Sequence, residues 1–153
     1  MKRREFFKSA MVSLAAVSYP SWKGYAADNQ IPIEIPAITG AGEPIAIERK
    51  AIEEFRRNLQ GRLLLPEDDG YNIARLVRNM VIDKRPALIA QCRNNDDVIE
   101  SVNFARHYQL LTAVKCGGHS VSGKGTCDDG LIIDLSPLQG TSAMSGFASI
   151  NAA

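Results

Sequence analysis

The chain has 153 residues and 18 basic against 17 acidic side chains, which gives a formal net charge of +1. Residues 1–27 hold five of the basic and one of the acidic side chains, so the remainder has 13 basic and 16 acidic side chains and a net charge of −3. The bulk charge therefore gives no support to a nucleic-acid partner, and the length suits one small domain with a hydrophobic core.

The first 27 residues have the layout of an export signal. A basic segment, Met1–Lys8, precedes a short apolar run at 10–17 and then small residues suited to cleavage. Arg3 and Arg4, followed by Glu-Phe-Phe-Lys, resemble the twin-arginine signal, which carries folded proteins; an ordinary secretory signal or a basic amphipathic helix is the alternative. The apolar run is far shorter than the roughly 20 residues of a membrane-spanning helix. We therefore expect a periplasmic or secreted protein with no stable membrane span.

Four elements are predicted between residues 28 and 80. Residues 28–43 contain two prolines and two glycines and indicate an extended linker. Residues 44–59 are predicted to form a helix, because Pro44 suits a first turn and apolar residues recur at helical spacing. A short strand is expected at 62–66 and a second helix at 71–80. The side chains expected to face inward from the second helix are Ile73, Leu76, Val77 and Met80.

A strand–helix–strand pattern follows. Strands are predicted from three apolar runs, at 86–90, 110–114 and 131–135. The helix between the first two strands begins after the capping residues Asn94 and Asn95 and runs to about Tyr108. We expect an α/β (α+β) fold over 44–138, with a small sheet of three or four strands and helices on one side.

The tail, residues 139–153, consists mostly of Ser, Ala and Gly, carries no charge and shows no sustained period. We expect it to be disordered or aberrant sequence outside the fold.

The most distinctive segment, Lys115-Cys116-Gly117-Gly118-His119-Ser120-Val121-Ser122-Gly123, follows the second strand of this unit. That position is the C-terminal end of a strand, where α/β sheets usually present ligands. Adjacent glycines let the backbone approach a ligand closely, and successive N–H groups form a concavity that suits a phosphate or pyrophosphate. We call residues 115–123 the glycine loop.

A P-loop NTPase is a remote alternative for this loop. Gly118, Gly123 and Lys124 satisfy the spacing GxxxxGK. The next position must be Ser or Thr to bind Mg²⁺, but it is Gly125, and a strand is predicted to follow where a P-loop needs a helix.

The segments on both sides of the loop form a wider pattern. A strand ends in basic Lys115, glycines, His119 and Ser120 follow, and the Asp129-Gly130 turn leads to a strand that ends Ile-Asp-Leu-Ser at Ser136. In this order and spacing, the run from Arg85 to Leu138 resembles the first half of the PCMH-type FAD-binding domain of the vanillyl-alcohol-oxidase family. It is similar above all to berberine-bridge-enzyme-like FAD-linked oxidases.

The resemblance implies FAD as cofactor and an oxidoreductase that takes hydride from a substrate C–H next to a hydroxyl. Amides of the glycine loop would hold the FAD pyrophosphate, with the Ser120 hydroxyl as an extra donor. Lys115 would support the phosphates or orient the loop, and Gly123 would allow the return turn. The residues assigned to cofactor binding are Lys115, Cys116, Gly117, Gly118, His119, Ser120 and Gly123.

His119 has a further implied role. In many relatives the matching histidine is bonded covalently to the 8α-methyl of the isoalloxazine, so His119 is the candidate attachment point. The alternative is a loop histidine that only contacts backbone. Many relatives have glycine where this chain has Cys116. A turn explains Asp128 and Asp129, so neither is assigned as a metal ligand. No residue is assigned as catalytic base.

Three cysteines, Cys92, Cys116 and Cys127, cannot all pair within one chain. Cys116 and Cys127 flank the loop and could form a disulfide if it folds back, which their sequence separation cannot decide. Their spacings match neither a zinc site nor a thioredoxin-type motif.

The resemblance also implies a second lobe of the FAD domain and a substrate domain that recognises a small molecule, both expected beyond Leu138. We therefore expect a truncated or frameshifted product, or the first piece of a split enzyme. The alternative is a non-catalytic exported α/β module, or a weak FAD binder. The sequence indicates neither the substrate, the electron acceptor nor the oligomeric state.

Overall fold

The computed structural model describes residues 31–138 in full and, of the tail, the backbone of 140–144 and 147–151. The predicted export signal at 1–27 and the first residues of the predicted linker lie outside the described residues. Among the described residues, none lies in a helix that is both long and apolar enough to cross a membrane.

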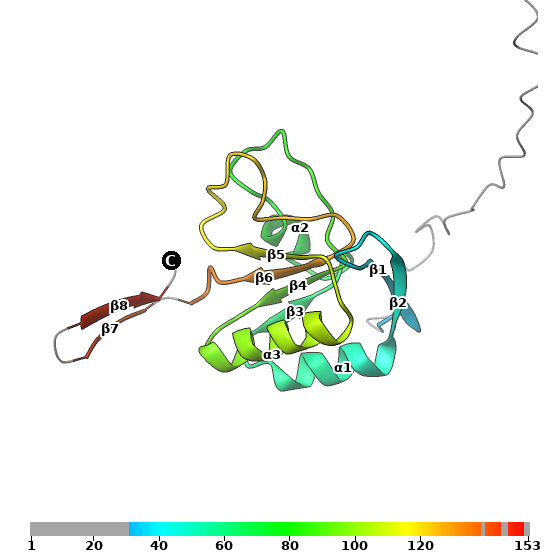
Figure 1. Cartoon of the computed structure of the whole chain (residues 1–153), viewed down its shortest axis with the longest axis horizontal. Helices are drawn as coiled ribbons and strands as arrows, with labels where there is room; N and C mark the ends of the chain where they lie inside the picture. Colours follow the sequence, from blue (N-terminus) through cyan, green and yellow to red (C-terminus); the bar gives the residue numbers. More distant parts are fainter. Residues whose placement is uncertain (1–30, 139, 145–146, 152–153) are drawn as a thin grey trace, which may run out of the picture. The chain divides into compact units, whose positions relative to one another are not determined.

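The main sheet has four strands in the order β3-β4-β6-β5 (Figure 1). They are β3 (Arg62–Leu64), β4 (Leu88–Gln91), β6 (Leu131–Asp134) and β5 (Thr112–Lys115). β4 and β5 both run parallel to β6, and β3 pairs antiparallel to β4. The predicted strands are thus confirmed, and the predicted strand–helix–strand unit is β4–α3–β5, with α3 at Asn95–His107. The order was not predicted: β6 lies between β4 and β5.

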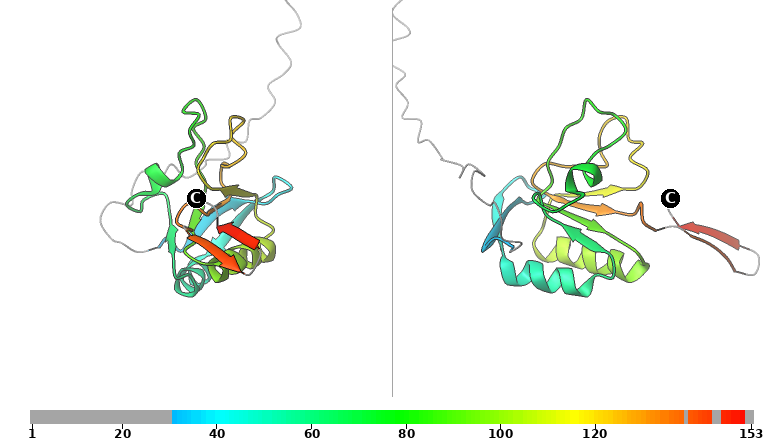
Figure 2. Two further views of the ribbon diagram at one scale, coloured as in Figure 1. Left: turned by 90° about the vertical axis from the view of Figure 1, so that its left-hand side faces the viewer. Right: turned by 180° about the vertical axis from the view of Figure 1, so that it is seen from behind.

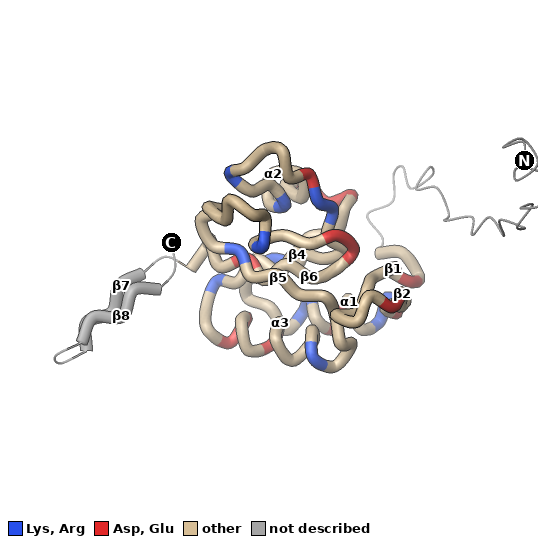
Figure 3. The backbone as a smooth tube through the Cα atoms, turned by 45° about the horizontal axis from the view of Figure 1, so that its top comes forward, with Lys and Arg blue, Asp and Glu red and all other residues tan. Residues whose placement is uncertain are grey.

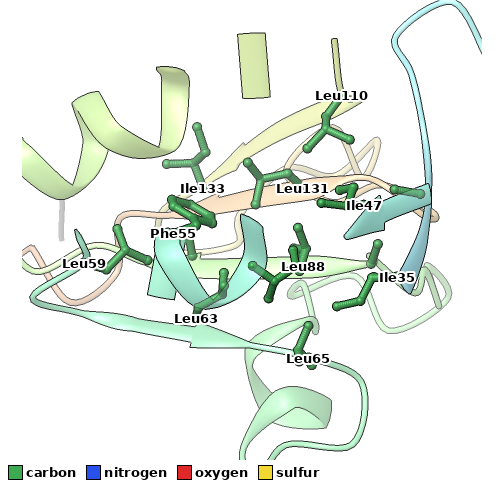
Figure 4. Close-up of a cluster of buried hydrophobic side chains, with 14 of the residues drawn as sticks. Ile35, Ile47, Phe55, Leu59, Leu63, Leu65, Leu88, Leu110, Leu131 and Ile133 are labelled. Carbon is green, nitrogen blue, oxygen red and sulfur yellow. The ribbon is translucent and has the colours of Figure 1, made fainter. Parts of the chain in front are cut away.

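Alternating side chains give the sheet two buried faces. Leu88, Ala90, Leu131 and Ile133 join one hydrophobic core with Phe55 of α1 (Arg49–Asn58), which lies beside α3 (Figure 4). Ile89 and Ile132 join a second core with Tyr71 of α2 (Tyr71–Ala74). The two long helices cover one face, as predicted, whereas α2 and the glycine loop lie over the other (Figures 1 and 2).

The predicted start of α3 is confirmed, and hydrogen bonds to the side chains of Asn94 and Asp97 fix it. We call the three bonds to the Asp97 carboxylate the cage around Asp97. Asn94 caps the helix, since its side-chain oxygen accepts the Asp97 amide at 2.8 Å. The Asp97 carboxylate, 1% exposed, accepts backbone N–H groups of Gln60 at 2.8 Å, Gly61 at 3.0 Å and Arg93 at 2.8 Å. These bonds join the helix start to the turn between α1 and β3.

The predicted linker at 28–43 and the predicted helix start at Pro44 are wrong. Two strands, β1 (Glu34–Ile38) and β2 (Pro44–Glu48), pair antiparallel there, and α1 begins only at Arg49. The buried side chains Ile35, Ala37 and Ile47 alternate with exposed ones, which is the period of a strand. The hairpin therefore belongs to the core of the domain.

The predicted helix at 71–80 is wrong beyond its first turn. α2 ends at Ala74, and Ile73 and Met80, predicted to face inward, are 79% and 84% exposed. Only Val77 of the later apolar residues is buried. The amide of Arg78 donates to the carbonyl of Gly118 at 2.9 Å, so a long-range hydrogen bond replaces the helical one.

The tail also differs from its prediction. β7 (Gly140–Met144) and β8 (Phe147–Asn151) pair antiparallel, whereas the composition predicted no regular structure. The sequence between them is Ser145-Gly146, a dipeptide typical of tight turns.

Candidate functional site

The C-terminal ends of β4, β6 and β5 place three polar side chains in one row. Asp134 is the register partner of Gln91 on one side and of Lys115 on the other. Asp134 is fully buried and accepts from the Ser136 hydroxyl at 2.7 Å and from the Gln91 side-chain amide at 3.3 Å. The glycine loop starts directly after Lys115, at this edge of the sheet.

Lys115 is a buried anchor. It is 9% exposed, and its Nζ donates to the carbonyl of Ala74, the last residue of α2, while lying 3.8 Å from Asp134 Oδ2. The charge of Lys115 is therefore balanced inside the protein. Of the two roles that the resemblance implies for Lys115, this geometry fits the orientation of the loop.

The backbone amides of four consecutive loop residues bear on whether the loop can hold an anion. Gly118 has a φ of +68°, in the left-handed region that favours glycine. Within the described residues, none of the amides of Gly117, Gly118, His119 and Ser120 donates a hydrogen bond. Successive N–H groups in such a turn suit the oxygens of a phosphate. The loop therefore fits the pyrophosphate of the cofactor implied by its sequence.

The second half of the loop is a closed turn. Ser120 Oγ accepts the Lys124 amide at 3.0 Å, and the Ser120 carbonyl accepts the Gly123 amide at 3.1 Å. Gly123 has a φ of +70°, and a Cβ there would lie 2.5 Å from Ile82 Cδ1. The Ser120 hydroxyl hydrogen stays available as a donor, because Ser120 Oγ is the acceptor in its bond to Lys124.

The side chains of His119 and Cys116 differ in exposure. His119 is exposed, so its imidazole is accessible to a large ring system, whereas Cys116 is half-buried. Cys127 is a buried free thiol, so the disulfide between Cys116 and Cys127 that the sequence left open is not formed in this structure. Burial raises the pKa of the Cys127 thiol to about 11.

The sequence missed the segment that forms the other wall of the site, residues 75–86. Its backbone runs along the glycine loop and the residues after it, with Asn79 Nδ2 donating to the Val121 carbonyl at 2.9 Å and the Arg85 amide donating to Asp128 at 2.9 Å. Arg78 lies directly against Gly118, through the amide bond described above. The several polar residues in 78–85 were the signal in the sequence that this segment is not a helix. The helical spacing of the apolar residues in the predicted helix at 71–80 obscured that signal.

The P-loop alternative is wrong for this loop. After Gly123 and Lys124 the described chain makes turns and then enters β6, so no helix follows to cradle a nucleotide phosphate.

Residues 86–151 match the sequence profile of a family described as FAD binding domain. (R)-6-hydroxynicotine oxidase of Paenarthrobacter nicotinovorans is 35% identical over 78 residues, 51% of this chain and 17% of that protein. The match extends past Leu138, so the resemblance does not end where the sequence predicted, and β7 and β8 lie within it.

Two solved structures are similar to the chain. The crystal structure of 6-hydroxy-D-nicotine oxidase from Arthrobacter nicotinovorans has a TM-score of 0.53 and 32% identity, over 55% of this chain and 18% of that one. BBE-like 1 from Physcomitrella patens has a TM-score of 0.52 at 21% identity, over 61% of this chain and 21% of that one, and shows the fold.

The chain spans about a sixth of the length of the first curated relative it matches. Residues 86–151 are therefore similar to the FAD-binding domain of PCMH-type FAD-linked oxidases, and the chain spans only part of those relatives.

Proposed function

We propose that this chain binds FAD with the glycine loop around the pyrophosphate, as part of an oxidoreductase that takes hydride from a substrate C–H next to a hydroxyl. The observation that carries the proposal is the run of four amides, Gly117 to Ser120, at the C-terminal edge of the sheet, which donate no hydrogen bond within the part of the chain that the structure describes. Bound FAD would supply a two-electron acceptor for such chemistry.

The protein's part in this function is positioning. The Lys115–Asp134 pair fixes the first residue of the loop, and the contact of Gly118 with Arg78 fixes its middle. Both hold the amides in place before a ligand arrives, so little ordering entropy opposes binding. We assign none of the described residues to the substrate or to the proton of its hydroxyl.

The binding experiment uses the full chain. Titration of the purified protein with FAD should give a saturable signal near one flavin per chain, and ADP should compete, because ADP carries the same pyrophosphate. Riboflavin, which has no phosphate, should not compete at equal concentration. Saturable binding of riboflavin with no effect of ADP would contradict the pyrophosphate site.

We further propose that His119 is the point of covalent flavin attachment. His119 is exposed and follows Gly118 in the loop, so no rearrangement of the core is needed to reach it. The new bond would join an imidazole nitrogen of His119 to the 8α-methyl carbon of the flavin. The imidazole would lose its N–H hydrogen and the methyl group would lose one hydrogen. O₂ would be the two-electron oxidant and would leave with both hydrogens as hydrogen peroxide.

In-gel fluorescence of denatured protein tests the covalent bond. The wild-type band should fluoresce after incubation with FAD and O₂, and the His119→Ala band should be dark although the variant still binds FAD. A matched His107→Ala variant, changed at the other histidine of the chain, should keep the wild-type fluorescence. A dark wild-type band from a yellow sample would sink His119 as the attachment point.

We also propose that residues 1–27 direct export through the twin-arginine route. The support is the sequence alone: a basic start with Arg3 and Arg4, a short apolar run and small residues at its end. Replacement of both arginines by lysine should retain the protein in the cytoplasm. Unchanged appearance in the periplasmic fraction would indicate an ordinary secretory signal or none.

A further inference from the structure

A cation beside the glycine loop would strengthen the binding of a pyrophosphate there, and the structure has already used the one that the loop sequence suggests. Lys115 Nζ is buried between the Ala74 carbonyl and the Asp134 carboxylate. Moving it to a ligand would leave Asp134, which is fully buried, without its counter-charge. A cation that contacts the ligand would therefore come from another residue.

Arg78 is the basic residue that the fold places against the middle of the loop. Its amide donates to the Gly118 carbonyl at 2.9 Å, and a Cβ built on Gly118 would lie 3.7 Å from the Arg78 nitrogen. The Arg78 backbone is thus held beside the free amides by a hydrogen bond that does not involve its side chain. A change of the Arg78 side chain can leave this contact intact.

The Arg78 side chain is exposed and, within the described residues, makes no hydrogen bond or ion pair. Two neighbouring cations are engaged: Arg75 pairs with Asp83, and Lys84 Nζ donates to the Thr126 carbonyl at 3.4 Å. Figure 3 shows basic residues gathered around α2 and the adjacent loops. A guanidinium presents a planar fork that matches two phosphate oxygens.

We infer that Arg78 is the cation of this site, and that its guanidinium binds the pyrophosphate of the ligand whose other oxygens face the amides of the glycine loop. The inference rests on the proposed function for the identity of the ligand. The phosphate site would then have two parts. The glycine loop provides the amides, and residues 75–86, which carry no sequence motif, provide the guanidinium of Arg78.

The test compares Arg78→Gln with Lys124→Gln, a matched change of an exposed cation just after the glycine loop. Both are made in the His119→Ala chain, so that binding stays reversible. Calorimetric titrations use three probes: FAD, ADP and inorganic pyrophosphate. Arg78→Gln should weaken binding of all three by about 10- to 100-fold, as expected for a lost charge-assisted hydrogen bond, and Lys124→Gln by less than about twofold.

Two further measurements separate a direct contact from a structural effect. Arg78→Lys should recover part of the lost affinity, and the dependence of log Kd on log salt concentration should become shallower in Arg78→Gln. Circular dichroism and the thermal midpoint should be unchanged, since the backbone bond to Gly118 remains. A loss of affinity that appears only with a lowered midpoint would overturn the inference.

The outcomes separate the inference from the proposed function. The inference is overturned if Arg78→Gln changes the Kd for FAD by less than about twofold, or if Lys124→Gln weakens FAD binding equally. Either result leaves FAD binding by the parent chain standing. Binding of pyrophosphate that depends on Arg78, without binding of FAD, supports the inference and overturns the function. Binding of neither probe by the parent chain overturns both.

Discussion

Lys115 and Asp134 are register partners on β5 and β6, and the Lys115 Nζ lies 3.8 Å from Asp134 Oδ2 inside the protein. The same Nζ donates to the last carbonyl of α2, at Ala74. One buried ammonium group therefore joins the sheet, α2 and the first residue of the glycine loop. The family resemblance implied that Lys115 either supports the phosphates or orients the loop, and the pairing with Asp134 fits the second role.

Removal of one partner from this pair should be costly. Lys115→Met or Asp134→Asn should each lower the free energy of unfolding by about 3 kcal/mol, because the remaining group is buried without its partner. The double variant should lose less than the sum of the two single losses. Urea denaturation measures all three, and a single-variant loss below about 1 kcal/mol would contradict a desolvated pair. Asp83→Asn, which breaks the exposed pair with Arg75, is the control and should cost far less.

Gly123→Ala should destabilise the protein by about 1–3 kcal/mol, from a left-handed φ and from overlap of the new Cβ with Ile82. The two causes can be separated in an Ile82→Ala background, where the overlap is removed and the φ is not. There the cost of Gly123→Ala should fall, as measured by the shift in the urea midpoint. Equal costs in both backgrounds would show that backbone strain alone matters.

Asp97→Asn should lower the free energy of unfolding by about 3 kcal/mol. The carboxylate oxygens of Asp97 accept three backbone N–H groups, and the side-chain NH₂ of asparagine would face some of these donors without being able to accept from them. The exposed neighbour Asp96 also lies in the first turn of α3, and Asp96→Asn should cost only about 0.3–1 kcal/mol through the helix dipole. Thermal unfolding of the two variants in parallel checks this ranking. Similar losses for both would contradict the cage around Asp97.

Burial raises the pKa of Tyr71 from 10.0 to about 12, against the opposing effect of nearby Arg75 and Arg85. The neutral phenol is favoured in the folded state, so its contribution to stability is complete below pH 10 and is lost as the pH rises to about 12. Tyr71→Phe should be less stable at pH 8 by about 1 kcal/mol, through loss of the bond from Tyr71 Oη to the Pro86 carbonyl, 2.6 Å long in the structure.

The stability difference between wild type and Tyr71→Phe should then shrink above pH 10 and change sign as the wild-type phenol ionises, since two pKa units correspond to about 2–3 kcal/mol. Denaturation at a series of pH values measures this difference, in which the titration of other groups cancels. A difference that stays constant from pH 8 to 11 would show that the Tyr71 pKa is not raised.

Predictions from sequence succeeded where the signal is local. The capping residues before α3, the apolar runs of β4, β5 and β6, and the position of the glycine loop all follow from short-range patterns, and the structure has them. The prediction at 44–59 failed at its start because Ile45 fits a helical stripe with Ile52 as well as a strand, and pairing of β2 with β1 decided between them. The prediction at 71–80 failed because the Arg78 amide bonds to Gly118, far along the chain.

The sequence by itself determined the strand–helix–strand unit and a glycine-rich loop with a histidine in its middle, because backbone freedom and hydrophobic period are properties of neighbouring residues. The tertiary structure alone decided that β6 lies between β4 and β5, that Lys115 is paired with Asp134, and that Arg78 lies against Gly118. These facts depend on which distant segments share a buried face and satisfy each other's polar groups, and no local pattern encodes that choice.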